Sequence, residues 1–141
     1  GKNDEWNNEY VAHVRPLMRR QKIRLMQPRL DLKVPEGEGH IYEYRFYQTK
    51  VGQAGAWIDA ISEAMPAREK YSQNICLWQT EAENPNEVSH MWAYDDLDQR
   101  TQARSGANAD PAWQSFLKKS GSMLEEMENT FLIPAQFSPL K

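Results

Sequence analysis

The chain has 141 residues, of which 40% are hydrophobic and 11% aromatic, so it is long enough for one globular domain with a core and too short for two. Its 17 basic and 20 acidic residues give a net charge of −3, which excludes a strong electrostatic attraction to nucleic acid or to an anionic membrane. No apolar run approaches the roughly 20 residues of a membrane span, and the polar N-terminus is not a signal peptide, so the sequence predicts a soluble chain.

The N-terminal residues predict a helix and an extended segment. Four residues at helical spacing indicate a helix over residues 4–18, with an aspartate as its cap: Trp6, Tyr10, Val14 and Leu17. Residues 21–25 and 30–33 look extended on either side of Pro28, and the turn-rich residues 35–39 mark a boundary. We therefore expect a segment over 1–35 and a domain over 36–141. The apolar side chains of residues 4–33 predict that this segment folds onto the domain.

The residues after the boundary alternate between strand and helix patterns. Six of the ten residues in 40–49 are aromatic or β-branched, which is typical of a strand. The predicted elements are a strand over 40–49, a helix that ends at Pro66, strands over 72–80 and 87–94, helices over 97–105 and from Pro111, and a strand over 128–133. Asp95 and Asp96 are expected to cap the first of the last two helices, and Asp110 the second. The order β-α-β-β-α-β predicts an α+β fold of the ferredoxin-like, split β-α-β type, with an antiparallel sheet and helices on one face.

Two ends of the chain resemble each other. The helix and strand that run from Trp6 to Pro28 have similar residues, at a nearly constant offset, from Trp113 to Pro134. One interpretation is that the chain is the C-terminal repeat of a tandem protein and begins inside an earlier repeat. The other is chance similarity between two amphipathic helices.

Three polar residues alternate along the first strand of the domain. Glu43, Arg45 and Tyr47 share one face at steps of about 6.6 Å. They are suited to bind an anionic or carbonyl-bearing ligand, or to form an ion-pair network inside the protein. His90 with Trp92 similarly offers a general base beside a stacking surface, or a buried histidine with its hydrogen bonds satisfied.

A second pair of basic residues lies one helical turn apart. Arg100 and Arg104 are spaced to clamp an anion, or to pair with acids around their own helix. The histidines lie far apart and no phosphate-binding glycine loop is present, so we expect no metal site and no cofactor. The single cysteine, Cys76, lies in an apolar run and predicts a buried strand thiol, which suits a reducing compartment.

Several motifs together resemble the NIPSNAP family. They are residues 41–47 (IYEYRFY), 78–81 (WQTE), 90–94 (HMWAY), Arg100, Arg104, 110–113 (DPAW) and 133–140 (IPAQFSPL). The resemblance implies the dimeric α/β-barrel superfamily, in which the sheets of two copies face each other, and hence a homodimer through the sheet face. It also makes residues 1–35 resemble the end of a preceding NIPSNAP repeat, plus a linker. The expected location is cytoplasmic, or mitochondrial in a eukaryote.

Two classes of function follow from this resemblance. The first is a dimeric assembly or small-molecule-binding module, and the alternative is a cofactor-independent enzyme of oxygenase or isomerase type that acts on a small apolar substrate in the barrel. The expected pocket-lining residues face away from the helices, into the barrel: Glu43, Arg45, Tyr47, Trp78, His90, Trp92 and Tyr94. The helix-facing side is expected to carry the apolar sets, such as Tyr44 with Phe46.

Overall fold

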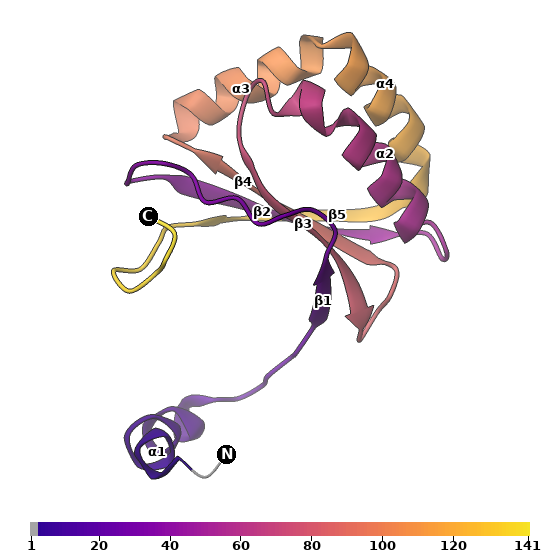
Figure 1. Cartoon of the computed structure of the whole chain (residues 1–141). Helices are drawn as coiled ribbons and strands as arrows, with labels where there is room; N and C mark the ends of the chain where they lie inside the picture. Colours follow the sequence, from indigo (N-terminus) through magenta and orange to yellow (C-terminus); the bar gives the residue numbers. More distant parts are fainter. Residues whose placement is uncertain (1–2) are drawn as a thin grey trace.

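Within residues 3–141, which the computed structural model describes, a five-stranded sheet has the order β1-β3-β4-β2-β5 (Figure 1). The strands are Leu25–Pro28 (β1), Ile41–Thr49 (β2), Asn74–Ala82 (β3), Glu87–Tyr94 (β4) and Leu124–Leu132 (β5). Each strand runs antiparallel to its neighbours. The central strands are therefore β4, β2 and β3, while β1 and β5 form the edges.

Three helices cover one face of this sheet (Figure 1). They are α2 (Ala54–Arg68), α3 (Leu97–Ala109) and α4 (Pro111–Ser120). Of the predicted caps, Asp96 and Asp110 are confirmed. The Asp96 carboxylate accepts a hydrogen bond from the backbone N–H of Gln99 at 2.7 Å, and the Asp110 carboxylate accepts one from Ala112 at 2.9 Å. Asp95 is not the N-cap residue of α3. The predicted ferredoxin-like α+β fold is thus confirmed. No helix within residues 3–141 is long and apolar enough to cross a membrane.

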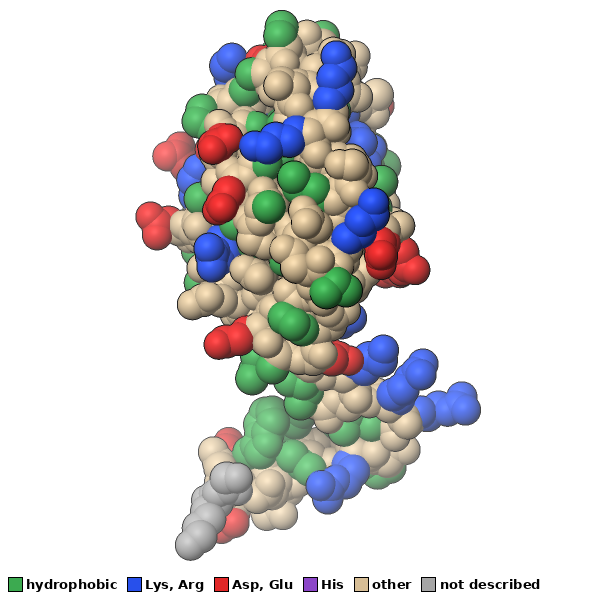
Figure 2. All heavy atoms as spheres, turned by 90° about the vertical axis from the view of Figure 1, so that its right-hand side faces the viewer, with side chains coloured by type: hydrophobic (Ala, Val, Ile, Leu, Met, Phe, Trp, Pro, Cys, Tyr) green, Lys and Arg blue, Asp and Glu red, His purple; other side chains and the backbone are tan. Residues whose placement is uncertain are grey.

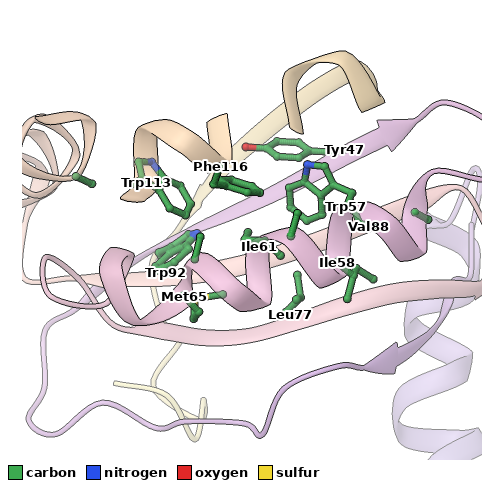
Figure 3. Close-up of a cluster of buried hydrophobic side chains, with 14 of the residues drawn as sticks. Tyr47, Trp57, Ile58, Ile61, Met65, Leu77, Val88, Trp92, Trp113 and Phe116 are labelled. Carbon is green, nitrogen blue, oxygen red and sulfur yellow. The ribbon is translucent and has the colours of Figure 1, made fainter. Parts of the chain in front are cut away.

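The main core lies between the sheet and these helices. The register of β2 and β4 pairs Arg45 with His90 and Tyr47 with Val88, so alternate residues of both strands share the helix-facing side. Helices α2 and α4 place Trp57, Ile61 and Phe116 against them, as Figure 3 shows. Complete burial of such side chains contributes about 1.5–3 kcal/mol each. The sheet and the helices therefore hold each other in place.

Two helices extend beyond their predicted ends. Helix α2 continues through Pro66 to Arg68, so the predicted end at Pro66 is wrong. The proline removes one backbone donor in the last turn, and the Glu69 N–H still donates to the Met65 carbonyl at 2.9 Å. Helix α3 also continues past Gly106, where a Cβ would come within 2.7 Å of the Tyr71 ring. This glycine therefore serves close packing and does not end the helix.

The sheet is not closed into a barrel in the single chain. On the outer face, which the three helices leave uncovered, Tyr44 and Trp78 are half-buried and in edge-to-face contact at 6.3 Å. The C-terminal tail covers one end of this face, where the Tyr42 hydroxyl donates to the Lys141 carbonyl at 2.9 Å. Strand β5 is a free edge and carries the exposed Glu125, Glu126 and Glu128. Closing the predicted barrel would require a second copy.

The N-terminal helical residues extend away from the domain (Figures 1 and 2). They form a π-helix (Trp6–Val11), α1 (Ala12–Val14) and a 3₁₀ turn (Arg15–Leu17). Trp6 stacks on Tyr10 at 4.2 Å yet is 53% exposed, and Leu17 is 81% exposed. The prediction that residues 4–33 fold onto the domain is therefore wrong for the helix and holds for β1, which pairs with β3. The inner face is already filled by α2, α3 and α4, so it offers the N-terminal helix no surface.

We expect trypsin to remove these N-terminal residues first. Arg19, Arg20 and Lys22 are exposed and lie outside any helix or strand, so the backbone there is accessible to a protease. Lys118 and Lys119 provide the internal comparison, because they are equally exposed but lie in α4. Mass spectrometry of a timed digest should show cleavage at 19–22 well before cleavage at 118–119. Equal rates at the two places would contradict the arrangement.

Candidate functional site

A cavity of about 470 Å³ lies between the sheet and the three helices. Its sheet side is formed by five residues that the sequence singled out: Arg45, Tyr47, His90, Trp92 and Tyr94. Its helix side includes Trp57, Arg68, Arg104, Trp113 and Phe116, of which three aromatic residues are drawn in Figure 3. A volume of this size is enough for a small organic molecule.

The cavity lies on the opposite side of the sheet from the predicted site. Glu43, Arg45, Tyr47, His90 and Trp92 were expected to face away from the helices, and that expectation is wrong. Their helix-facing orientation has a physical reason, because α2 supplies Trp57 as an aromatic partner for Tyr47 and His90, and α3 supplies Arg100 as a cation for Glu43. The predicted helix-facing pair, Tyr44 and Phe46, lies on the outer face instead.

Glu43 is the centre of a buried ion-pair network. Its carboxylate is 0% exposed and accepts hydrogen bonds from Arg45 at 2.6 Å and from Arg100 at 2.8 and 2.9 Å. Asn129 donates a further bond at 3.1 Å and Tyr94 one at 3.4 Å. Burial alone would raise the pKa of Glu43, but the bonds from Arg100 and the charges of the neighbouring arginines lower this pKa to about 2. Glu43 is therefore ionised at neutral pH and supports the cavity wall without lining it.

Arg45 links this network to the cavity. Its Nε donates to the Tyr47 hydroxyl at 2.5 Å while its Nη1 holds Glu43. Burial raises the pKa of Tyr47, so this hydroxyl stays protonated at neutral pH. The predicted grouping of Glu43, Arg45 and Tyr47 is confirmed as a geometry. Of the two interpretations of these residues, the internal ion-pair network describes the structure, because Glu43 and Arg45 already neutralise each other.

His90 is buried at 4% exposure and is held in one tautomer. The Trp92 indole N–H donates to His90 Nδ1 at 2.6 Å. Because an indole nitrogen only donates, Nδ1 must be unprotonated, and the neutral ring carries its proton on Nε2. Burial, together with the charge of Arg45, lowers the pKa of His90 to about 3. The Nε2 atom has no hydrogen-bond partner within residues 3–141.

Arg68 is a residue of the cavity that sequence reasoning missed. It is 3% exposed, donates to Ser72 at 2.7 Å and to the Tyr94 hydroxyl at 3.1 Å, and lies over the Trp92 ring at 4.3 Å. Burial lowers its pKa. Its spacing was a usable signal, because Arg68 follows Ile61 by seven residues and so falls on the buried stripe of α2.

The remaining predicted residues separate in the structure. Arg100 and Arg104 do not form one clamp, since Arg100 binds Glu43 while Arg104 lines the cavity. Trp78 lies on the outer face beside Tyr44 and takes no part in the cavity. Cys76 is a buried free thiol in β3, as predicted. Within residues 3–141 no cluster of histidine, cysteine or acidic side chains is placed to hold a metal ion.

An open antiparallel sheet with helices on one face, and a cavity between the two layers, defines a ferredoxin-like α+β domain. The NIPSNAP family model matches residues 42–139 of this domain. The chain therefore belongs to the NIPSNAP family. The match consists of one domain that covers most of the chain, and it gives no support to the prediction of an earlier repeat.

Individual proteins agree with this assignment. The chain is 31% identical to protein NipSnap homolog 3B of Mus musculus over 99% of this chain, and it spans 58% of the length of that relative. A crystal structure of a NIPSNAP family protein with unknown function from Agrobacterium tumefaciens is 33% identical, with a TM-score of 0.69 over 72% of this chain and 94% of that one. A candidate monooxygenase from Lactobacillus acidophilus has a TM-score of 0.66 at 15% identity, over 94% of this chain and 61% of that one, which is a likeness of fold alone.

Proposed function

We propose that this NIPSNAP domain is a small-molecule-binding module whose ligand occupies the cavity between the sheet and the helices. The cavity of about 470 Å³ is the observation that carries the proposal. Its walls combine aromatic side chains such as Trp57 and Phe116 with a few polar groups, which is the usual composition of a ligand site.

We also propose that two copies pair through the outer face of the sheet. Half-buried Tyr44, Phe46 and Trp78 support this, because an aromatic sheet face left in water is unfavourable. Pairing would leave the cavity, on the other face, open to its ligand. We retain the domain boundary near residue 35 as a proposal, with β1 as a strand that the N-terminal segment contributes to the sheet. The reducing compartment stays a prediction supported by the free thiol of Cys76.

Catalysis by a cofactor-independent oxygenase or isomerase mechanism is the second candidate. The position of His90 at the cavity favours it, since a buried imidazole is a common proton acceptor. The lowered pKa of His90 weakens it as a base, because a group with a pKa of about 3 holds a proton poorly at neutral pH. Binding is therefore the better supported function.

Native mass spectrometry tests cavity and pairing together. We expect a species of twice the 16.4 kDa chain mass that retains one small molecule per chain. Leu117→Trp, at the rim of the cavity on α4, should release the small molecule and keep the dimer. Leu97→Trp is the matched control, because Leu97 is also exposed on a helix but does not line the cavity, and it should keep both. A monomer would contradict the pairing, and retention in Leu117→Trp would contradict the cavity as the site.

A further inference from the structure

Two buried hydrogen-bond donors of the cavity wall have no acceptor. Trp57 Nε1 and His90 Nε2 are both buried and lack a partner within residues 3–141. Both residues line the cavity, and their ring centroids lie 5.6 Å apart. An indole N–H can only donate, and the bond from Trp92 fixes the His90 proton on Nε2, so both atoms require an acceptor. Leaving such donors unpaired destabilises a protein, which is why nearly all buried donors are paired.

The same cavity has an excess of positive charge. Arg45, Arg68 and Arg104 line it, and the carboxylate beside them on the wall is the exposed Glu125. Arg45 shares Glu43 with Arg100, while neither Arg68 nor Arg104 forms an ion pair within residues 3–141. A negative charge on a ligand would therefore be stabilised here, more strongly than in water because protein encloses part of the site.

The rest of the wall is mostly apolar, and Asn108, Ser120 and Glu125 are its other polar residues. Phe116, Trp113 and Ile61 face the cavity from the helices, and Leu124 and Met127 close it from the sheet side. These side chains offer no polar group that would favour a sugar or a nucleotide. A ligand of this cavity has an apolar body and meets the donors with one end.

We propose that the cavity binds an apolar carboxylic acid, whose oxygens accept hydrogen bonds from His90 Nε2 and Trp57 Nε1 and whose charge Arg104 balances. This inference rests on the proposed function and specifies its ligand class. One carboxylate provides two oxygens, each with more than one acceptor position, which is enough for both donors. Protein atoms cover both nitrogens, so ligand binding requires the two rings to shift slightly. Arg68 already donates to Ser72 and Tyr94, whereas Arg104 forms no ion pair or side-chain hydrogen bond within residues 3–141.

Three probes of similar shape test separately the apolar body, the hydrogen-bond acceptor and the negative charge of the proposed ligand. Naphthalene has no acceptor, 2-acetylnaphthalene adds a neutral carbonyl oxygen, and 2-naphthoate adds a carboxylate. We expect isothermal titration calorimetry at neutral pH to show affinity rising about tenfold from the first to the second and about tenfold again to the third. These ratios are measured on the unmodified chain, so they do not depend on whether any variant folds.

Variants then assign the donors. Trp57→Phe and His90→Phe should each lower the affinity for 2-naphthoate about tenfold and change that for naphthalene little, since each removes one donor and keeps a ring. Arg104→Met should bring 2-naphthoate and 2-acetylnaphthalene to equal affinity. Trp113→Phe is the matched control, because it removes an indole from the same wall whose nitrogen is not one of the unpaired donors. It should alter all three affinities by one factor and leave their ratios unchanged.

The possible failures are distinguishable. If no probe binds, the proposed binding function is wrong and the inference fails with it. If all three probes bind equally well, the cavity binds apolar molecules and the assignment to carboxylic acids is overturned. Ratios that stay unchanged in both Trp57→Phe and His90→Phe would likewise overturn it. In the expected case, the indole N–H resonance of Trp57 also moves downfield when 2-naphthoate is added, as identified by its loss in Trp57→Phe.

Discussion

Replacing Glu43 by glutamine is expected to lower the free energy of unfolding by about 3 kcal/mol, as measured by urea denaturation at neutral pH. The carboxylate is completely buried and holds both Arg45 and Arg100, so its loss leaves two guanidinium groups without a counter-charge. This loss of stability is at the low end for a broken buried ion pair. The reason is that both arginine side chains keep some contact with water, Arg45 at 16% exposure and Arg100 at 20%.

Glu126→Gln is the matched control for this prediction. It makes the same chemical change at an exposed position on β5, where a surface substitution should alter stability by less than about 0.5 kcal/mol. Arg45→Ala and Glu43→Gln together should cost less than the sum of the two single changes, since they remove one shared interaction. Effects at Glu43 as small as those at Glu126 would show that the network lies open to solvent.

Acidification should destabilise the protein well before its carboxylates titrate. The pKa of His90 falls from an ordinary 6.5 to about 3 in the folded state, so the unfolded chain binds a proton at this site more tightly than the folded chain does. Stability from the neutral ring is therefore fully present above pH 6.5 and is lost as the pH falls from 6.5 towards 3. One proton gives a slope of about 1.4 kcal/mol per pH unit in that window.

The groups around His90 explain why its pKa is low in the folded state. Arg45, Arg68 and Arg104 repel a second positive charge, Glu43 is the opposing acid, and a proton on Nδ1 would break the bond from Trp92. Unfolding curves measured between pH 7 and 5 should show the slope, and His90→Phe should flatten it. Below about pH 4.5 Glu43 adds a second loss, because its own pKa is lowered to about 2 in the folded state. A stability that does not change between pH 7 and 5 would contradict the buried neutral histidine.

Local features of the fold were predictable from the sequence. The side of the sheet that the helices cover was not. The capping aspartates at 96 and 110 depend only on neighbouring backbone, and β2 follows from its content of aromatic and β-branched residues, so these local features were found. Alternation also showed that Glu43, Arg45 and Tyr47 share a face. It could not show which face the helices cover, because aromatic residues occupy both sides of β2 and the choice depends on partners such as Arg100, far away in the sequence.

The N-terminal helix and Gly106 illustrate the same limit. An apolar stripe such as Trp6 and Tyr10 indicates that a helix would gain by burial, but not that a complementary surface exists in the same chain. The helix predicted over 97–105 stops just before Gly106, whereas in the structure it continues through this glycine, which packs closely against the ring of Tyr71. Packing between distant residues decided both cases.

The free edge of the sheet has a consequence for the behaviour of the protein in concentrated solution. Strand β5 is nine residues long, and within residues 3–141 no strand pairs with its outer edge, which makes it a template for pairing with β-strands of other molecules. Glu125, Glu126 and Glu128 place three negative charges on that exposed strand. When two such edges approach each other, like charges meet and edge-to-edge growth of the sheet into aggregates is opposed. The acidic residues of β5 are therefore expected to oppose such pairing in concentrated solution.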